Sequence, residues 1–597
     1  MNTIITFILL SSIPTHQSLS IRIDPATHTV HGETTITVEG PGELQVEGAG
    51  LFTNLSDGDK IEYQWQGTFQ DSVEAGERVG QIHNFSVDAH VSEQGVFLSD
   101  HAPWYPKPVD ANGMPYLRMM DLEVAPIDGW TFVGSGNLVD GTWSSPRPVD
   151  GMALVGNKHV TASEVVHTVQ GPVTINVHLS PEHEGKLPYY LQASKEYLDL
   201  YTPLLGAYPY DQFTVVENFF SSGFAYPGFT VLGPRVVGMA PKSLAPGYLD
   251  HELVHNWWGN GVYVDQKGGN WCEALTSFTT NYGRRYLEDG QEAARRYRRG
   301  LLNKVSLDPS LDNGPLRLFG SADPSSGTID RFVGYDKGAY VFMMLEDVLN
   351  AYGDVAPRES KIWEMLHLFA QENMGKRASW HDIQVAAEAM FPDRPSGWLD
   401  PFFELWVTRH TLQSTTFELT ATPPQQIEIE QGPTWIDIDH DYKYYRVLPQ
   451  EQISPTIAGT LAGTSVVLDE SVQAIADTGA WLADVESGPN FLLIGESAIH
   501  EHEELWKNAT DAISFIEGGF QIDGKQYVGE DLAVLHTMQH PKNDDLFVTV
   551  FYSVGDVGWE RLRFIWYYTK DTTVIWDEDE TLVRRVFEPT TRLTIKE

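Results

Sequence analysis

The segment from Asp250 to Gly259, DHELVHNWWG, carries the strongest chemical signal in the chain. On a helix, His251 and His255 lie four residues apart, so their imidazoles project from one face. Two nitrogen ligands of a tetrahedral zinc ion need this arrangement. The carboxylate of Glu252 lies beside the pair, where it can accept a proton from a water bound to the metal. The segment therefore predicts a zinc site with its own general base.

A catalytic zinc ion needs a third protein ligand and one open position. Glu273 is the predicted third ligand, because it lies at the start of the next apolar helical run. Asp265 is the alternative, but it lies in a glycine-rich loop, which is a poor rigid support. Cys272 offers a soft ligand next to Glu273, although a free cysteine is more commonly a small buried apolar residue.

The composition narrows the class of protein. With 42% hydrophobic residues the chain can build packed cores, and its 597 residues point to about two to four domains. The 82 acidic residues exceed the 40 basic ones, and the resulting net charge of −42 repels nucleic acid and anionic lipid. A single cysteine excludes an internal disulfide, a cysteine-rich zinc module and an iron–sulfur site.

The one basic cluster, Arg295 to Arg299, is interpreted as a solvated helix face or an internal strip of ion pairs.

The sequence pattern changes along the chain, which predicts a multidomain α+β fold. Residues 19–180 contain short alternating runs separated by glycine and proline turns, as expected for an N-terminal β sandwich or saddle. Residues 181–412 are mostly of helical periodicity and contain the histidine segment. Residues 413–453 are expected to form a β linker, and residues 454–597 a C-terminal α/β domain. Amphipathic helices are predicted at Tyr335–Leu349, Lys361–Gln371, Trp380–Met390 and Trp398–Val407.

The N-terminus contains an apolar run from Ile4 to Ile13. Its length suits the hydrophobic region of a signal peptide, so residues 1–18 are predicted to direct export to the periplasm or the exterior. Residues 1–3 lack Lys and Arg, which leaves a first β-strand and a cytoplasmic location as the alternative. No run reaches the roughly 18 apolar residues that a spanning helix needs, so no transmembrane segment is predicted.

The sequence HELVHNWWGN, followed by an acidic residue on the next helix, resembles the zinc aminopeptidases related to aminopeptidase N and leukotriene hydrolase, a group of gluzincins. Residues 335–339, YDKGA, resemble the family's Tyr-x-Lys-Gly segment, whose tyrosine hydroxyl supports the transition state. Residues 19–25 and 126–138 resemble strands of the family's N-terminal domain. The resemblance covers about residues 16–410. It implies a β saddle, a thermolysin-like catalytic domain and one zinc ion per chain.

Two features depart from the family pattern. Seventeen residues separate His255 from Glu273, whereas the family usually has eighteen, which a one-residue loop deletion explains. Residues 222–228, SGFAYPG, resemble the family's Gly-Gly-Met-Glu-Tyr-Pro-Gly, so Ala225 stands where a glutamate grips the substrate's α-amine. An alanine cannot accept hydrogen bonds from an ammonium group. Either Glu217 takes over this duty or recognition of the amine is lost.

These motifs together predict zinc-dependent hydrolysis of peptide bonds, resembling that of an aminopeptidase. Glu252 is the expected base, and Tyr335 the expected donor to the developing oxyanion. The backbone of residues 223–225, which are Gly223, Phe224 and Ala225, is predicted to bind the peptide as an added strand. Two alternatives stay open: an oligopeptidase or endopeptidase that does not recognise the amine, and a non-catalytic binding protein on the same fold. The sequence does not predict an oligomeric state.

Overall fold

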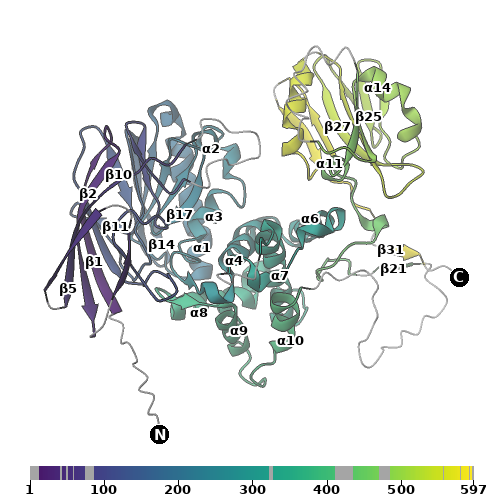
Figure 1. Cartoon of the computed structure of the whole chain (residues 1–597). Coiled ribbons are helices and arrows are strands. Elements are labelled where there is room, and N and C mark those ends of the chain that lie inside the picture. Colours follow the sequence, from purple (N-terminus) through teal and green to yellow (C-terminus); the bar gives the residue numbers. More distant parts are fainter. Residues whose placement is uncertain are drawn as a thin grey trace, which may run out of the picture. The chain divides into compact units, whose positions relative to one another are not determined.

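The computed structural model describes residues 13–40, 44–48, 51–57, 59–73, 87–321, 327–410, 435–437, 439–469, 485–555, 557–578, 580–589 and 592–594 (Figure 1). The chain divides into two compact units. The first unit comprises Met1–Ala294 and Gly314–Arg409, and the second unit Arg295–Asn313 and His410–Glu597. Both units combine sheets with helices, which confirms the predicted multidomain α+β class.

The first unit begins with two sheets that share one hydrophobic core. The core contains Ile21 and Leu122 of the larger sheet and Leu98 and Val155 of the smaller one, all 3% exposed or less. The larger sheet consists, in spatial order, of β11 (Asn137–Val139), β12 (Thr142–Ser144), β9 (Met119–Val124), β1 (Ile13–Asp24), β2 (Thr29–Glu39), β5 (Lys60–Thr68) and β4 (Leu51–Asp57). The smaller sheet consists of β10 (Thr131–Gly134), β13 (Leu154–Asn157), β7 (Gly95–Leu98) and β6 (Ala89–Ser92).

The start of the first sheet bears on the predicted signal peptide. Residues 1–12 lie outside the described residues, but residues 13–18 form the first half of β1 and pair with β2. Gln17 is fully buried there and donates to the carbonyl of Pro106 at 2.7 Å, while its own amide oxygen accepts from Arg118 Nε at 2.8 Å. Residues 13–18 are therefore part of the sheet, whereas the apolar run Ile4–Ile13, on which both readings of the N-terminus depend, lies outside the described residues except for Ile13. Among the described residues, no helix is long and apolar enough to span a bilayer.

A third, mixed sheet crosses the boundary expected at residue 181. Its order is β14 (Val160–Thr168), β15 (Gly171–Leu179), β16 (Gln212–Glu217), β18 (Phe229–Leu232) and β17 (Gly223–Tyr226). β14 and β15 precede the expected boundary, yet β15 pairs in parallel with β16 from beyond it. Among the described strands, β17 forms one edge of this sheet and β14 the other, and β17 runs antiparallel to β18.

Helices form the remainder of the first unit. α1 (Leu187–Leu205) packs on β14 and β15, and Trp257, Trp258 and Trp271 are fully buried around the helices of the site. The helices are α3 (Leu249–Val254), α4 (Cys272–Ser277), α5 (Arg284–Asp289), α7 (Gly338–Leu349), α8 (Lys361–Asn373), α9 (Trp380–Ala389) and α10 (Asp400–Phe403). Three π-helical turns adjoin them, at Phe278–Gly283, Val333–Lys337 and Glu404–Thr408. Helical structure is confirmed in all four segments predicted from periodicity, with π turns at one end of α7 and α10, but α7 is buried on nearly every side.

The second unit is built on a six-stranded sheet with a hydrophobic core cluster against it on each side. The sheet order is β22 (Thr464–Leu468), β23 (Asn490–Ile494), β28 (Phe547–Ser553), β27 (Ala533–Gln539), β29 (Thr573–Trp576) and β30 (Thr581–Arg585). Around it lie α11 (Ile457–Leu461), α14 (Glu496–Glu501), the 3₁₀ segment Val557–Tyr567, and β24 (Ser514–Ile516), β25 (Gly519–Ile522) and β26 (Lys525–Val528). Within the predicted β linker, the described residues contain one short strand, β21 (Trp435–Asp437).

The basic cluster lies on α6 (Gln291–Leu307), and most of that helix belongs to the second unit. Arg299 is 3% exposed and Arg295 forms an ion pair with Glu588. Both guanidinium groups lie over the ring of Tyr442, at 5.7 and 5.9 Å from its centroid. Of the two interpretations offered for this cluster, the internal strip of charges is therefore correct.

A buried histidine in β27 makes the stability of the second unit depend on pH. His536 Nε2 lies 2.7 Å from the carbonyl oxygen of Asp511, which can only accept, so this nitrogen carries the proton. Nδ1 accepts from Thr573 Oγ1 at 2.9 Å. Burial lowers the pKa of His536 to about 4, whereas the unfolded chain has its ordinary value of about 6.5.

We therefore expect His536 to contribute its full stability above pH 6.5 and to lose about 3 kcal/mol as the pH falls toward 4, because the unfolded state binds the proton first. Guanidinium unfolding of the full chain at several pH values tests this against His536→Gln. The variant should show a shallower loss of stability between pH 6.5 and 4.5. His500→Gln, at an exposed histidine of the same unit, should keep the wild-type slope. Equal slopes for His536→Gln and the wild type would contradict the assignment.

Candidate metal centre and active-site pocket

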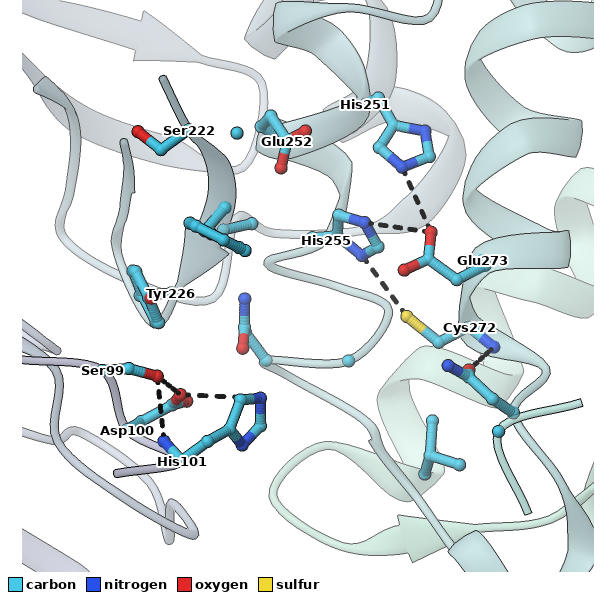
Figure 2. A pocket seen from close by; sticks show the side chains of 18 of the residues that line it. Ser99, Asp100, His101, Ser222, Tyr226, His251, Glu252, His255, Cys272 and Glu273 are labelled. Atoms are coloured by element: carbon cyan, nitrogen blue, oxygen red, sulfur yellow. Dashed lines mark hydrogen bonds and ion pairs between the residues drawn. The ribbon is translucent and has the colours of Figure 1, made fainter. Parts of the chain in front are cut away.

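The first unit contains a cavity of about 710 Å³ whose lining comes from both its β and its helical parts (Figure 2). This volume lies in the range typical of substrate-binding pockets. Figure 2 shows His251, His255 and Glu273 on one side, and Ser99 and Asp100 of the β part on the other. Every residue predicted for the site lines this cavity: Gly223, Phe224, Ala225, His251, Glu252, His255, Glu273 and Tyr335.

A buried carboxylate anchors the short helix α3. Asp250 is fully buried, and its Oδ1 accepts from the main-chain N–H groups of Gly247 at 2.8 Å and Tyr248 at 3.1 Å. These two bonds satisfy amide groups at the start of the helix. Its Oδ2 accepts from the hydroxyl of Tyr201 at 3.0 Å and faces Arg284 at 3.4 Å. The histidine helix is thus fixed to α1 and α5 rather than held by its own six residues.

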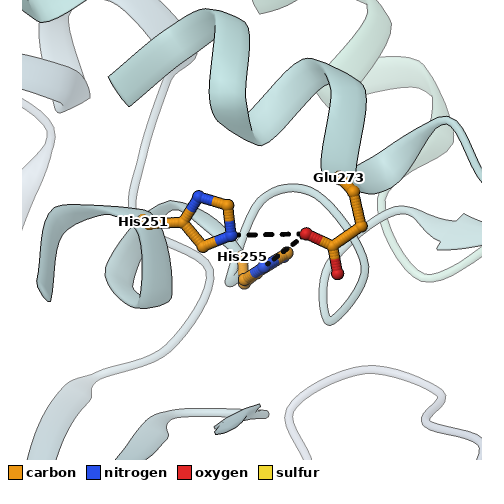
Figure 3. A group of neighbouring side chains, drawn as sticks. All are labelled: His251, His255 and Glu273. Atoms are coloured by element: carbon orange, nitrogen blue, oxygen red, sulfur yellow. Dashed lines mark ion pairs between the residues drawn. The ribbon is translucent and has the colours of Figure 1, made fainter. Parts of the chain in front are cut away.

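Three side chains from two helices converge on one point (Figure 3). His251 Nε2 lies 3.3 Å from Glu273 Oε2, and His255 Nε2 lies 3.6 Å from the same oxygen. His251 comes from α3, His255 follows the last residue of α3, and Glu273 lies in the first turn of α4. One ligand atom from each residue lies within 4.8 Å of the other two.

The donor set fits a zinc ion. Glu273 Oε2 is buried and receives no hydrogen bond from the described residues, although two imidazole nitrogens face it. Burial alone would raise the pKa of this carboxyl, but the neighbouring charges of His255 and His251 outweigh burial and hold it well below its usual range. An ionised oxygen between two imidazole nitrogens is a common zinc ligand set.

The far side of His255 is fixed by a main-chain carbonyl. His255 Nδ1 lies 3.0 Å from the oxygen of Trp258, which only accepts, so Nδ1 donates to it and Nε2 is the nitrogen that faces Glu273 and the place of a metal. Cys272 Sγ lies 3.3 Å from this same Nδ1 and donates to Trp258 O at 3.0 Å. The Cys272 thiol therefore lies behind His255, and burial raises the pKa of this thiol.

Asp265, the alternative third ligand, is engaged elsewhere: its side chain caps the 3₁₀ turn Gln266–Gly268.

Tyr335 lies in the π-helical turn before α7, next to the histidines. Its ring is nearly parallel to that of His251, with centroids 6.1 Å apart, and meets Phe319 edge-on at 6.0 Å. The guanidinium of Arg331 lies over the ring of Tyr335, 4.1 Å from its centroid. Burial, followed by the charge of Glu273, raises the pKa of Tyr335 well above its usual value. The hydroxyl therefore keeps its proton and remains a hydrogen-bond donor.

The predicted substrate-binding residues form β17, and their surroundings decide one open question. Ala225 is half-buried and pairs with Thr230 of β18. Glu217 does not line the cavity: its carboxylate accepts from the N–H of Ser180 at 2.9 Å and contacts His183 Nδ1 at 2.8 Å. Glu217 is only 2% exposed, and burial raises its pKa. The alternative in which Glu217 replaces the missing glutamate is therefore wrong.

The cavity also contains charged residues that the sequence analysis missed. Asp100 and Asp150 come from loops of the β part, and Arg331 precedes the tyrosine segment. Arg377 is the first residue of β20 (Arg377–Ala378), which pairs with β19 (Tyr263–Val264). None of these residues belongs to a local motif, and their proximity depends on long-range packing, so no sequence signal was available for them.

Known proteins resemble this chain in structure but not in sequence. No protein-family model and no curated protein matches it. The crystal structure of the M1 zinc metallopeptidase from Deinococcus radiodurans aligns with a TM-score of 0.50 at 15% identity, covering 68% of this chain and 95% of that chain. A substitution mutant of a Deinococcus radiodurans M1 zinc metallopeptidase aligns with a TM-score of 0.50 at 16% identity, covering 68% and 96%.

The fold over about two thirds of the chain is thus that of a zinc metallopeptidase. More specifically, it is the M1 fold, the fold of the aminopeptidase N group, so the resemblance seen in the sequence motifs is confirmed at the level of the fold.

Proposed function

We propose that this chain is a zinc-dependent peptidase that hydrolyses peptide bonds. The observation that carries the proposal is the buried Glu273 Oε2, which receives no hydrogen bond from the described residues and faces the Nε2 atoms of His251 and His255. These three residues would hold one zinc ion per chain. When bound there, zinc supplies Lewis acidity to a water molecule and to a substrate carbonyl.

The remaining steps belong to the chain's own side chains. Glu252 lines the cavity beside the two histidines, where its carboxylate can take the proton of the attacking water and deliver it to the leaving amine. Tyr335 keeps its proton, so its hydroxyl can donate to the carbonyl oxygen as negative charge develops. The edge strand β17 offers main-chain groups with which an extended peptide can pair.

One observation favours a second candidate. Ala225 occupies the position at which the resembling family grips the substrate's amine, and Glu217 points elsewhere. An oligopeptidase that cleaves peptides with blocked N-termini is therefore the alternative within the same chemistry.

Metal analysis and peptide mapping test the proposal together. The purified chain should contain about one zinc ion, and His255→Ala should lose it. His500→Ala, at an exposed histidine of the second unit, is the matched control and should keep the metal. Matched peptides with free and acetylated N-termini then separate the two candidates, because an aminopeptidase cuts only free ones. A zinc-loaded protein that cuts neither would overturn the peptidase proposal and favour a binding protein.

A further inference from the structure

A second cavity, of about 920 Å³, adjoins the cavity of the metal centre, and we name it the second cavity. Its lining comes from the β part, within residues 110–117, and from the helical part, within residues 265–267 and 375–377. Gln266 and Arg377 line both cavities, so their side chains form the boundary between the two. Like the first cavity, the second has the size of a ligand-binding pocket.

The boundary is fixed on one side and adjustable on the other. Arg377 donates to the carbonyl oxygens of Val264 and Pro115, both at 3.0 Å, and faces Asp150 at 3.5 Å. Val264 lines the first cavity and Pro115 the second, so this guanidinium joins the helical part to the β part between them. Gln266 is exposed, and exposed side chains change rotamer within nanoseconds. Gln266 therefore does not close the passage permanently.

Tyr263 has an unused hydrogen-bond donor beside this boundary. It lines the first cavity, is 3% exposed, and has the Arg377 guanidinium 6.0 Å from its ring centroid. Its hydroxyl makes no hydrogen bond with the described residues, and the hydroxyl of Tyr210 donates instead to the carbonyl of Asn260 at 2.6 Å. Burial raises the pKa of Tyr263 well above its usual value, so the hydroxyl keeps its proton. A buried donor without an acceptor costs free energy, which a ligand carbonyl would recover.

We infer that a peptide substrate extends from the metal centre past Tyr263 into the second cavity, and that one of its main-chain carbonyls accepts a hydrogen bond from the Tyr263 hydroxyl. The inference rests on the proposed peptidase function and names its substrate class, which is peptides long enough to occupy both cavities. Each residue of such a peptide carries a carbonyl acceptor, which suits a donor at a boundary that the chain has to cross. Whether the residues before or after the cut enter the second cavity is distinguished by experiment.

Tyr263→Phe tests the inference because it removes the hydroxyl and keeps the ring. Three peptides share one sequence around the cut: a short one, one lengthened by a few residues on the N-terminal side, and one lengthened on the C-terminal side. Calorimetric titration into zinc-loaded Glu252→Gln measures their binding without turnover. We expect one of the lengthened peptides to bind more tightly than the short one. Tyr263→Phe in the same background should weaken that peptide about 3- to 10-fold, as for loss of a neutral hydrogen bond, and leave the short peptide unchanged.

A variant that fills the second cavity gives an independent test. Lys267 is exposed and lines the second cavity but not the first. Lys267→Trp should therefore reduce the affinity for the lengthened peptide to that of the short one. Lys158→Trp, in the turn between β13 and β14, and Tyr189→Phe, at an exposed tyrosine of α1, are the matched controls and should change neither affinity.

Equal affinity for the short and both lengthened peptides would overturn the inference, as would a gain in affinity that survives either Tyr263→Phe or Lys267→Trp. A gain on the N-terminal side assigns the second cavity to residues before the cut, and a gain on the C-terminal side to residues after it. Turnover by the wild type separates this inference from the proposed function. If the wild type cuts no peptide but the difference in binding remains, the peptidase proposal fails and the second cavity stands as a peptide site. If the wild type cuts peptides but lengthening adds no affinity, the role of the second cavity fails alone.

Discussion

Glu252→Gln is expected to lower kcat by about 10²- to 10⁴-fold while the protein keeps its zinc. Glutamine preserves the size of the side chain but cannot accept the proton of the attacking water. The metal should remain, because the group of mutually close ligand atoms in this cavity consists of His251, His255 and Glu273 and does not include Glu252. Turnover of a cleaved peptide and zinc content, measured on the same preparation, give both values.

Glu501→Gln is the matched control for this prediction. It makes the same chemical change at an exposed glutamate of α14 in the second unit and should leave kcat and zinc content at the wild-type level. Full turnover by Glu252→Gln with the metal retained would remove Glu252 from the role of base. Loss of both metal and turnover would instead indicate that Glu252 supports the metal site.

The metal centre was predictable from sequence because its geometry is mostly local. The spacing of His251 and His255 determines that both lie on one helix face, and α3 has that helical conformation. Glu273 was inferred from its position at the start of the next helical run, and it lies in the first turn of α4. The structure brings these three residues together, whereas Asp265 and Cys272 are engaged in a helix cap and a thiol contact.

The carboxylates that line the cavity from the β part were not predictable, for a physical reason. Asp100 and Asp150 lie in loops after β7 and before β13, and those two strands pair only because of the sheet's long-range register. A loop carboxylate in an acidic chain carries no periodicity that distinguishes a cavity-lining residue from a solvated one. The same reason applies to Glu217, which was one of the two alternatives left open for the missing glutamate. Proximity in sequence to the 222–228 segment suggested a shared site, but the fold directs the carboxylate at the end of β16 toward Ser180 and His183.

The organisation of the chain was likewise predictable where it depends on local sequence, and not where it depends on long-range packing. Helical periodicity correctly predicted the helices between residues 335 and 407, although α7 is buried on nearly every side rather than on one face. It did not reveal that residues 295–313 pack with the C-terminal part of the chain. Arg299 of that segment is buried over Tyr442, a residue far from it in sequence. A run of arginines looks like a solvated face until its buried partner is known.

Tyr335→Phe is expected to lower kcat by about 10²- to 10³-fold, as found for removal of a single donor to an oxyanion. The substitution deletes one hydroxyl and keeps the ring, so the contacts with His251, Phe319 and Arg331 can persist. The fold and the zinc content should therefore be unchanged. KM should change little, because the hydroxyl acts on charge that develops only in the transition state. Steady-state kinetics with one cleaved peptide measures both constants.

The pH profile gives this prediction a second test. Because burial and the charge of Glu273 raise the pKa of Tyr335, the wild-type hydroxyl stays protonated up to and beyond the ordinary tyrosine value of about 10. Tyr335 therefore contributes no alkaline limb to the profile, and Tyr335→Phe should lower kcat by the same factor at every pH from 6 to 9. Tyr189→Phe, at an exposed tyrosine of α1, is the matched control and should leave kcat unchanged. A Tyr335→Phe defect that grows only above pH 8, or one that falls wholly on KM, would mean that this hydroxyl does not donate to the developing oxyanion.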